Sequence, residues 1–234
     1  MKKLLLAALA MFSLSTVSYA VDNEPEEGLT TQVFLGMTGS NIRGLEYNLK
    51  VGGTAGIKFE YMLPNAHGTY INAGLDWIMK GSQLDIELST PKGNIGATNK
   101  LCPQYFEIPV HVGYRYNLSE DLGFYADFGP YFAVGFAGKN KFCIDTDGYR
   151  EYESSTKFFK KKDNGFQRWD AGLGLRIGAE YNQHYSLNLG MDWGLTDMYT
   201  NEFREDWANN PLSAGVNLPK PRNFSFNLSF GYRF

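Results

Sequence analysis

The chain has 234 residues and a formal net charge of −3 at pH 7. This mildly acidic balance gives no reason to expect a nucleic-acid partner, because nucleic acids select strongly basic surfaces. Glycine and aromatic residues are abundant and cysteine is nearly absent. The length allows one barrel of about eight strands or one all-β domain of another kind.

The first 20 residues have the pattern of a secretory signal peptide. A basic start precedes an apolar run from Leu4 to Phe12, and Ser18 and Ala20 are small residues where a signal peptidase reads them. The run is shorter than the roughly 20 residues of a transmembrane helix, and no cysteine stands at the cleavage point. We expect a signal peptide over residues 1–20, a short acidic periplasmic lead-in over 21–28 and one barrel domain over 29–234.

The rest of the chain contains eight segments in which apolar and polar residues alternate. This period of two predicts strands with one apolar and one polar face. The lengths suit tilted strands that cross a bilayer, which need about 10 residues. The predicted strands are residues 32–37, 54–63, 71–79, 106–116, 122–136, 169–181, 185–195 and 224–234.

The connections between these segments alternate between short and long. Short turns follow residues 63, 116 and 181, while long polar stretches cover 39–50, 80–103, 139–165 and 197–222. Short periplasmic turns and long outer loops are typical of a transmembrane barrel, and an even number of strands leaves both termini in the periplasm. Aromatic residues at both ends of the apolar faces fit two interfacial girdles. A soluble lipocalin-like barrel would have its apolar face inside and no reason for paired belts.

The sequence therefore predicts an all-β fold, a transmembrane antiparallel up-and-down β-barrel of about eight strands. The polar faces would line its lumen, which in a barrel of this size is only wide enough for side chains to fill. Charges buried there must pair, so we expect a salt-bridged plug. The predicted lumen residues are Lys58, Glu60, Asp76, Glu107, His111, Arg115, Asp127, Asp170, Arg176, Glu180, Asp192 and Arg233.

No segment predicts a catalytic, cofactor or metal site. A surface enzyme of this architecture would need a serine and a histidine on the lipid-facing side, but His67 and His184 fall in predicted turns and His111 points inward. The segment from Asp145 to Gly148 resembles the start of a calcium loop but lacks the further acidic ligands. We therefore expect a non-enzymatic protein without cofactor or metal.

Cys102 and Cys143 are the only cysteines, and they follow the upper ends of two strands that a short turn joins. Because an exported protein reaches an oxidising compartment and the count is even, we predict a disulfide between them, with two idle thiols as the alternative.

The last residues carry a resemblance. Phe230, Tyr232 and Phe234 end an aromatic strand at the C-terminus, which resembles the assembly signal of Gram-negative outer-membrane barrels. With the signal peptide and the strand pattern, the chain resembles the PorT-like outer-membrane β-barrel family from about Gly28 to Phe234. The resemblance implies outer-membrane localisation, contact with the barrel assembly machinery and, in some members, a role in protein secretion.

Two functions follow as hypotheses. The first is a barrel whose long outer loops bind a partner or stabilise the envelope, with outer-membrane lipid, lipopolysaccharide and an extracellular or periplasmic protein as expected partners. The second is a narrow porin-like channel for small solutes or cations, since the polar faces carry an excess of carboxylates.

Overall fold

The computed structural model describes residues 28–45, 48–64, 66–90, 93–146, 149–159, 165–210 and 217–234. The predicted signal peptide and all but the last residue of the predicted lead-in lie outside the described residues.

Eight of the described strands form a closed antiparallel ring. In chain order they are β1 (Gly28–Arg43), β2 (Lys50–Met62), β3 (Thr69–Met79), β5 (Gly93–Asn117), β6 (Leu122–Thr146), β8 (Trp169–Tyr181), β9 (Tyr185–Gly194) and β10 (Arg222–Arg233). Each of these strands pairs with the next one named, and β10 pairs with β1 to close the ring. The pairing of β5 with β6 continues beyond the ring, where β4 pairs with β5 and β7 pairs with β6. The predicted up-and-down barrel of about eight strands is confirmed.

The ring turns its apolar face outward. In β10, Phe226, Leu228 and Phe230 are 42–56% exposed, whereas the alternating Ser225 and Ser229 are at most 4% exposed. Since successive side chains of a strand point to opposite faces, a polar interior is the direct consequence of the sequence pattern. A water-soluble barrel would have the opposite arrangement.

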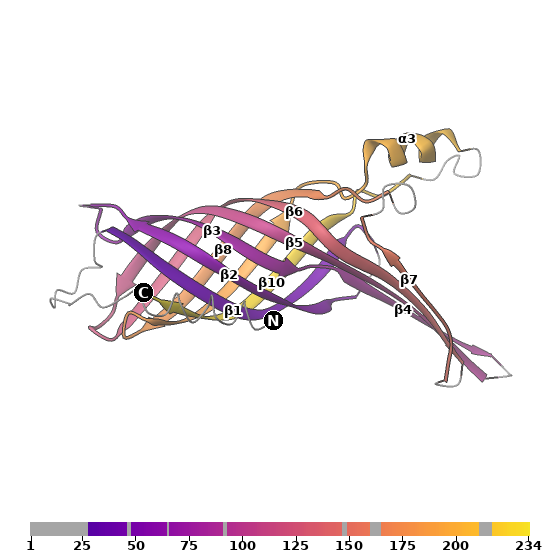
Figure 1. The fold of residues 1–234 in the computed structure, drawn as a ribbon, viewed down its shortest axis with the longest axis horizontal. Coiled ribbons are helices and arrows are strands. Elements are labelled where there is room, and N and C mark those ends of the chain that lie inside the picture. Colours follow the sequence, from indigo (N-terminus) through magenta and orange to yellow (C-terminus); the bar gives the residue numbers. More distant parts are fainter. Residues whose placement is uncertain are drawn as a thin grey trace, which may run out of the picture.

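Short turns gather at one end of the ring, here called the turn end. They connect β2 to β3, β5 to β6 and β8 to β9, and β10 finishes at the same end (Figure 1). The opposite end is called the arm end, because strands continue there beyond the ring.

The arm is a four-stranded extension of the barrel wall. Its outer strands are β4 (Ser82–Thr90) and β7 (Tyr149–Lys157), and its inner strands are residues 93–101 of β5 and 139–146 of β6. Their order is β4-β5-β6-β7, and the arm projects obliquely from the ring (Figure 1). The stretches 80–103 and 139–165, expected as loops, are therefore largely strand.

A glycine marks the point where the arm leaves the ring. Lys80 and Gly81 separate β3 from β4, and both strands pair with successive parts of β5. Gly81 has φ +145°, and a Cβ there would lie 2.1 Å from the carbonyl oxygen of Leu101. Glycine is therefore the residue that fits this break.

The long connection between β9 and β10 contains a short helix, α3 (Asn201–Asn209). Its N-cap is Thr200, whose hydroxyl accepts from the backbone N–H of Phe203 at 3.2 Å. Arg204 donates to Asp197 at 2.6 Å and to the carbonyl of Pro219 at 2.9 Å, which ties the helix to the chain on both sides.

Among the described residues, no helix has the length and apolar character needed to cross a membrane.

Candidate functional site

The lumen is the part of the ring where charged residues gather, and it is filled in layers. The first layer, at the turn end, is built on two arginines. Arg115 of β5 contacts Glu60 at 2.5 Å and Glu180 at 2.6 Å, and Arg233 of β10 contacts Glu180 at 3.0 Å and Glu60 at 3.7 Å. Four side chains from four strands thus form one closed ionic ring across the lumen, which satisfies charges that would be costly alone.

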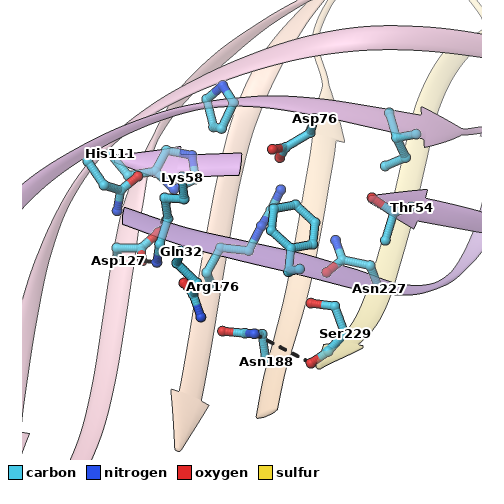
Figure 2. Close-up of a pocket in the computed structure, with 14 residues that line it drawn as sticks. Gln32, Thr54, Lys58, Asp76, His111, Asp127, Arg176, Asn188, Asn227 and Ser229 are labelled. Atoms are coloured by element: carbon cyan, nitrogen blue, oxygen red, sulfur yellow. Dashed lines mark hydrogen bonds and ion pairs between the residues drawn. The ribbon is translucent and has the colours of Figure 1, made fainter. Parts of the chain in front are cut away.

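The second layer centres on Asp127 of β6. Its carboxylate accepts from Tyr70 at 2.8 Å, lies 2.6 Å from Nδ1 of His111 and is 3.7 Å from the ammonium group of Lys58. Figure 2 shows Lys58, His111 and Asp127 close together at one side of the cavity. Asp127 is 2% exposed, so these neighbours replace its contact with water.

The third layer holds Arg176 of β8. Arg176 pairs with Asp192 at 2.6 Å and lies 3.7 Å from Glu107. The side chain of Asp76 makes no ion pair with the described residues and faces a cavity of about 40 Å³ (Figure 2). A cavity of this size holds only a few waters, so the space beside Asp76 is a pocket within the filled lumen.

The fourth layer is organised by Lys80, which lies at the break between β3 and β4. Its ammonium group is 2.7 Å from Glu107 and 3.4 Å from Asp170, and it sits 4.3 Å from the ring centroid of Tyr131. Lys80 is 1% exposed. The hydroxyl of Tyr131 donates to Asp170 at 3.2 Å, so this layer joins carboxylate, cation and aromatic ring.

An apolar lid closes the lumen above the fourth layer. Phe158 and Phe159 follow β7, and Phe166 and Met198 come from the connections on either side of β8 and β9. All four are at most 9% exposed and pack with Tyr105 and Tyr131 from the barrel wall. The lid is therefore a small hydrophobic core at the arm end of the ring.

Stacked aromatic rings connect the lid to α3. Ring centroids are 4.5 Å apart between Phe158 and Phe166, 5.3 Å between Phe166 and Tyr199, and 4.9 Å between Tyr199 and Phe203. The helix thus rests on the lid through a continuous column of rings.

The structure places all twelve predicted lumen residues on the inner face of the ring. Ten are buried, and the side chains of Lys58 and Arg176 are 13% and 15% exposed. Lys80 is a lumen residue that the sequence analysis does not predict, because it assigns Lys80 to a loop. The even-numbered residues of β3, such as Asp76 and Ile78, point inward, and Lys80 continues that alternation. The alternation is the signal that would have identified it.

The predicted disulfide between Cys102 and Cys143 is wrong. Both thiols are free. Cys102 pairs across the strands with Lys139, while Cys143 pairs with Thr98, four residues further out. Four strand residues span about 13 Å, well beyond the reach of a disulfide. The error arose because the two strands were expected to span 106–116 and 122–136, whereas β5 and β6 continue into the arm and contain both cysteines.

The proposed assembly signal forms the closing seam of the ring. Tyr232 pairs with Val33, and Phe230 with Leu35, across β10 and β1. The backbone N–H of Phe234 donates to the carbonyl of Thr31 at 2.8 Å. The rings of Tyr232 and Phe234 pack edge to face with centroids 5.1 Å apart.

Among the described residues, no group of three or more His, Cys, Asp or Glu is arranged to hold a metal ion. The Asp145–Gly148 turn lies partly outside the described residues.

A closed ring with an apolar exterior and an ion-paired interior defines the class of membrane-spanning β-barrels. Within that class, a family model described as "Outer membrane protein beta-barrel domain" matches residues 21–200. The chain belongs to this family, and its place is the outer membrane.

Solved structures of small outer-membrane proteins resemble the chain at low identity. OprG from Pseudomonas aeruginosa is 16% identical with a TM-score of 0.41, over 91% of this chain and 99% of OprG. Ail, the attachment invasion locus protein of Yersinia pestis, is 15% identical with a TM-score of 0.36, over 89% of this chain and 100% of Ail. These values are too low to carry a functional argument. No curated protein matches the chain.

Proposed function

We propose that this protein is a closed, non-enzymatic barrel that anchors a rigid β-sheet arm outside the membrane, and that the arm is its binding element. The observation that carries the proposal is the arm itself. β5 and β6 each run for 25 residues from the ring into the arm. A loop that needed only to connect two strands would not require this extension.

One face of the arm has the composition of a binding surface. Leu84 and Ile86 of β4, Ile95 and Ala97 of β5, Phe142 and Ile144 of β6 and Tyr152 of β7 share that face through the strand register. Ile86 is 55% exposed and Tyr152 is 52% exposed. Apolar patches of this kind mark contact sites for other proteins, so we propose a protein partner.

The channel hypothesis receives less support. Four charged layers and an apolar lid occupy the lumen, and an eight-stranded ring leaves no spare width. The excess of carboxylates remains, but most of them are held in ion pairs. The enzyme hypothesis gains no support from the histidines, because His111 is buried in the lumen beside Asp127 and the other two lie in turns.

We further propose that the turn end faces the periplasm and that the arm faces outward. Short turns at one end and an extended structure at the other support this orientation. Membership of the narrower PorT-like group, a role in secretion, and contact with lipopolysaccharide and the assembly machinery belong to the same proposal.

Site-specific photo-crosslinking in intact cells tests the binding role. A photoreactive residue at Ile86 or Tyr152 should give a discrete crosslinked protein. The matched controls are Asp85 and Glu153, which neighbour these positions in β4 and β7 and point to the other face. Equal crosslinking from both faces, or none from either, would contradict binding through the apolar face.

A further inference from the structure

A groove of about 730 Å³ lies where the arm leaves the ring, and its lining is basic. Lys139 and Lys141 of β6, Lys157 of β7 and Arg168 before β8 contribute to it, together with Phe136. Among the described residues that line it, none is a carboxylate. The concentration of positive charge in one concave surface is the first observation.

The strand register places lysines directly opposite one another. Lys100 of β5 pairs with Lys141, and Lys139 pairs with Lys157. Directly opposed residues in an antiparallel pair have Cβ atoms about 5 Å apart, and like charges in such pairs are destabilising. The Lys100–Lys141 pair therefore favours an anion that relieves its repulsion.

A β-bulge turns these lysines toward the lipid-facing side. The register shifts between Gln104 and Tyr105 of β5, where β6 carries one extra residue, Phe136. Before the shift, odd-numbered residues of β6 such as Ala133 point inward and are buried. After it, Lys139 pairs with Cys102, on the face of β5 that also carries Phe106.

The basic groove therefore continues the apolar outer surface of the barrel. The rings of Phe106 and Phe136 stack with centroids 4.3 Å apart and are 45% and 41% exposed. On the same face, the next acids, Asp85 and Glu153, lie in a row further out along the arm. Moving away from the ring, the face changes from aromatic to basic to acidic.

We propose that this groove binds the phosphate group of an anionic lipid in the leaflet at the arm end. Membrane interfaces place aromatic side chains at the level of the headgroups, so a basic band immediately beyond Phe106 and Phe136 meets headgroup phosphates. Charge-assisted hydrogen bonds from lysine and arginine to phosphate are strong. A lipid is favoured over free phosphate because the groove is continuous with the lipid-facing surface. The inference rests on the proposed outward orientation of the arm end, but it does not depend on which protein the arm binds.

Native mass spectrometry of the full chain released from nanodiscs tests this directly. The nanodiscs contain zwitterionic phosphatidylcholine with a minor fraction of lipid A, a phosphorylated glycolipid. The wild-type protein should retain lipid A, and Lys139→Gln/Lys141→Gln should weaken its apparent affinity about a hundredfold, since two charged hydrogen bonds are lost and each contributes roughly a factor of ten or more. The control Lys50→Gln/Lys220→Gln removes two lysines elsewhere and should retain lipid A as the wild type does.

A second readout separates binding from a structural role. In phosphatidylcholine alone, Lys139→Gln/Lys141→Gln should stabilise the barrel, because it removes the repulsion between Lys141 and Lys100. With lipid A present, the same variant should be less stable than the wild type. Heat-dependent gel mobility reports both the fold and the stability.

Two results would overturn the proposal. Equal retention of lipid A by the wild type and the Lys139→Gln/Lys141→Gln variant would show that the groove is not the site. Complete displacement of lipid A by millimolar inorganic phosphate would show a site for free anions instead of a lipid headgroup.

Discussion

At the scale of single residues, stability depends on charges that are buried together. Lys80 is the clearest example, because one ammonium group lies between two buried carboxylates. The same principle applies to Arg115, which bridges Glu60 and Glu180. Removing one member of such a group leaves the others buried without compensation.

Replacing Lys80 with methionine should destabilise the barrel by about 3 kcal/mol, the cost of breaking a buried ion pair. The urea midpoint of unfolding in detergent micelles measures this change. The control is Lys220→Met, the same replacement at an exposed position, which should have little effect. The double variant Lys80→Met/Glu107→Gln should regain part of the loss. Additive effects would contradict coupling between the two side chains.

The lid gives a second prediction at this scale. Phe158 is 0% exposed, whereas Phe142 in the arm is 39% exposed. Phe158→Ala should lower the free energy of unfolding by about 3 kcal/mol because it leaves a cavity. Phe142→Ala should cost much less in the same urea titration. Similar costs at both positions would mean that the lid is not a packed core.

At the scale of elements, the strand pairings of the arm are distinct from those that close the ring. Beyond the pairs Gln83–Lys100 and Lys141–Ser155, β4, β7 and the outer parts of β5 and β6 pair only within the arm. None of these pairings contributes to closure of the ring.

Replacing residues 84–99 and 142–154 each with Asn-Gly should therefore leave a folded barrel, since Asn-Gly suits a two-residue hairpin turn. Gel mobility with and without boiling would report the ring, which should still migrate anomalously until heated. Removal of an equal length from the ring strands β8 and β9 provides the contrast and should abolish folding. Loss of the folded band on trimming the arm alone would contradict the separation of arm and ring.

The elements that could be predicted from the sequence are those whose two faces meet different solvents. Strict alternation identified the ring strands and the inward direction of residues such as Asp127 and Arg176. The arm escaped prediction because only β4 alternates strictly, while its other strands alternate in part. Asn99 and Ser154, for example, lie on the apolar face beside Phe142. The bulge at Gln104 and Tyr105 also changes the parity of β6, so the positions of Lys139 and Cys143 could not be extended from Tyr131 and Ala133.

At the scale of the whole molecule, the barrel combines an apolar exterior, a layered ionic interior and a lid that supports α3. The filled lumen makes the ring a rigid foundation, and the arm extends the same strands beyond it. These features favour an anchor for an external binding element over a pore.

The most direct test is electrical conductance of the refolded full chain in a planar bilayer, with insertion verified by heat-dependent gel mobility of the same preparation. We expect no stable conductance steps, because the four charged layers and the aromatic lid leave no continuous aqueous path. A reproducible open state of the wild-type protein would contradict the closed barrel. It would instead support the hypothesis that the carboxylate-rich lumen conducts cations.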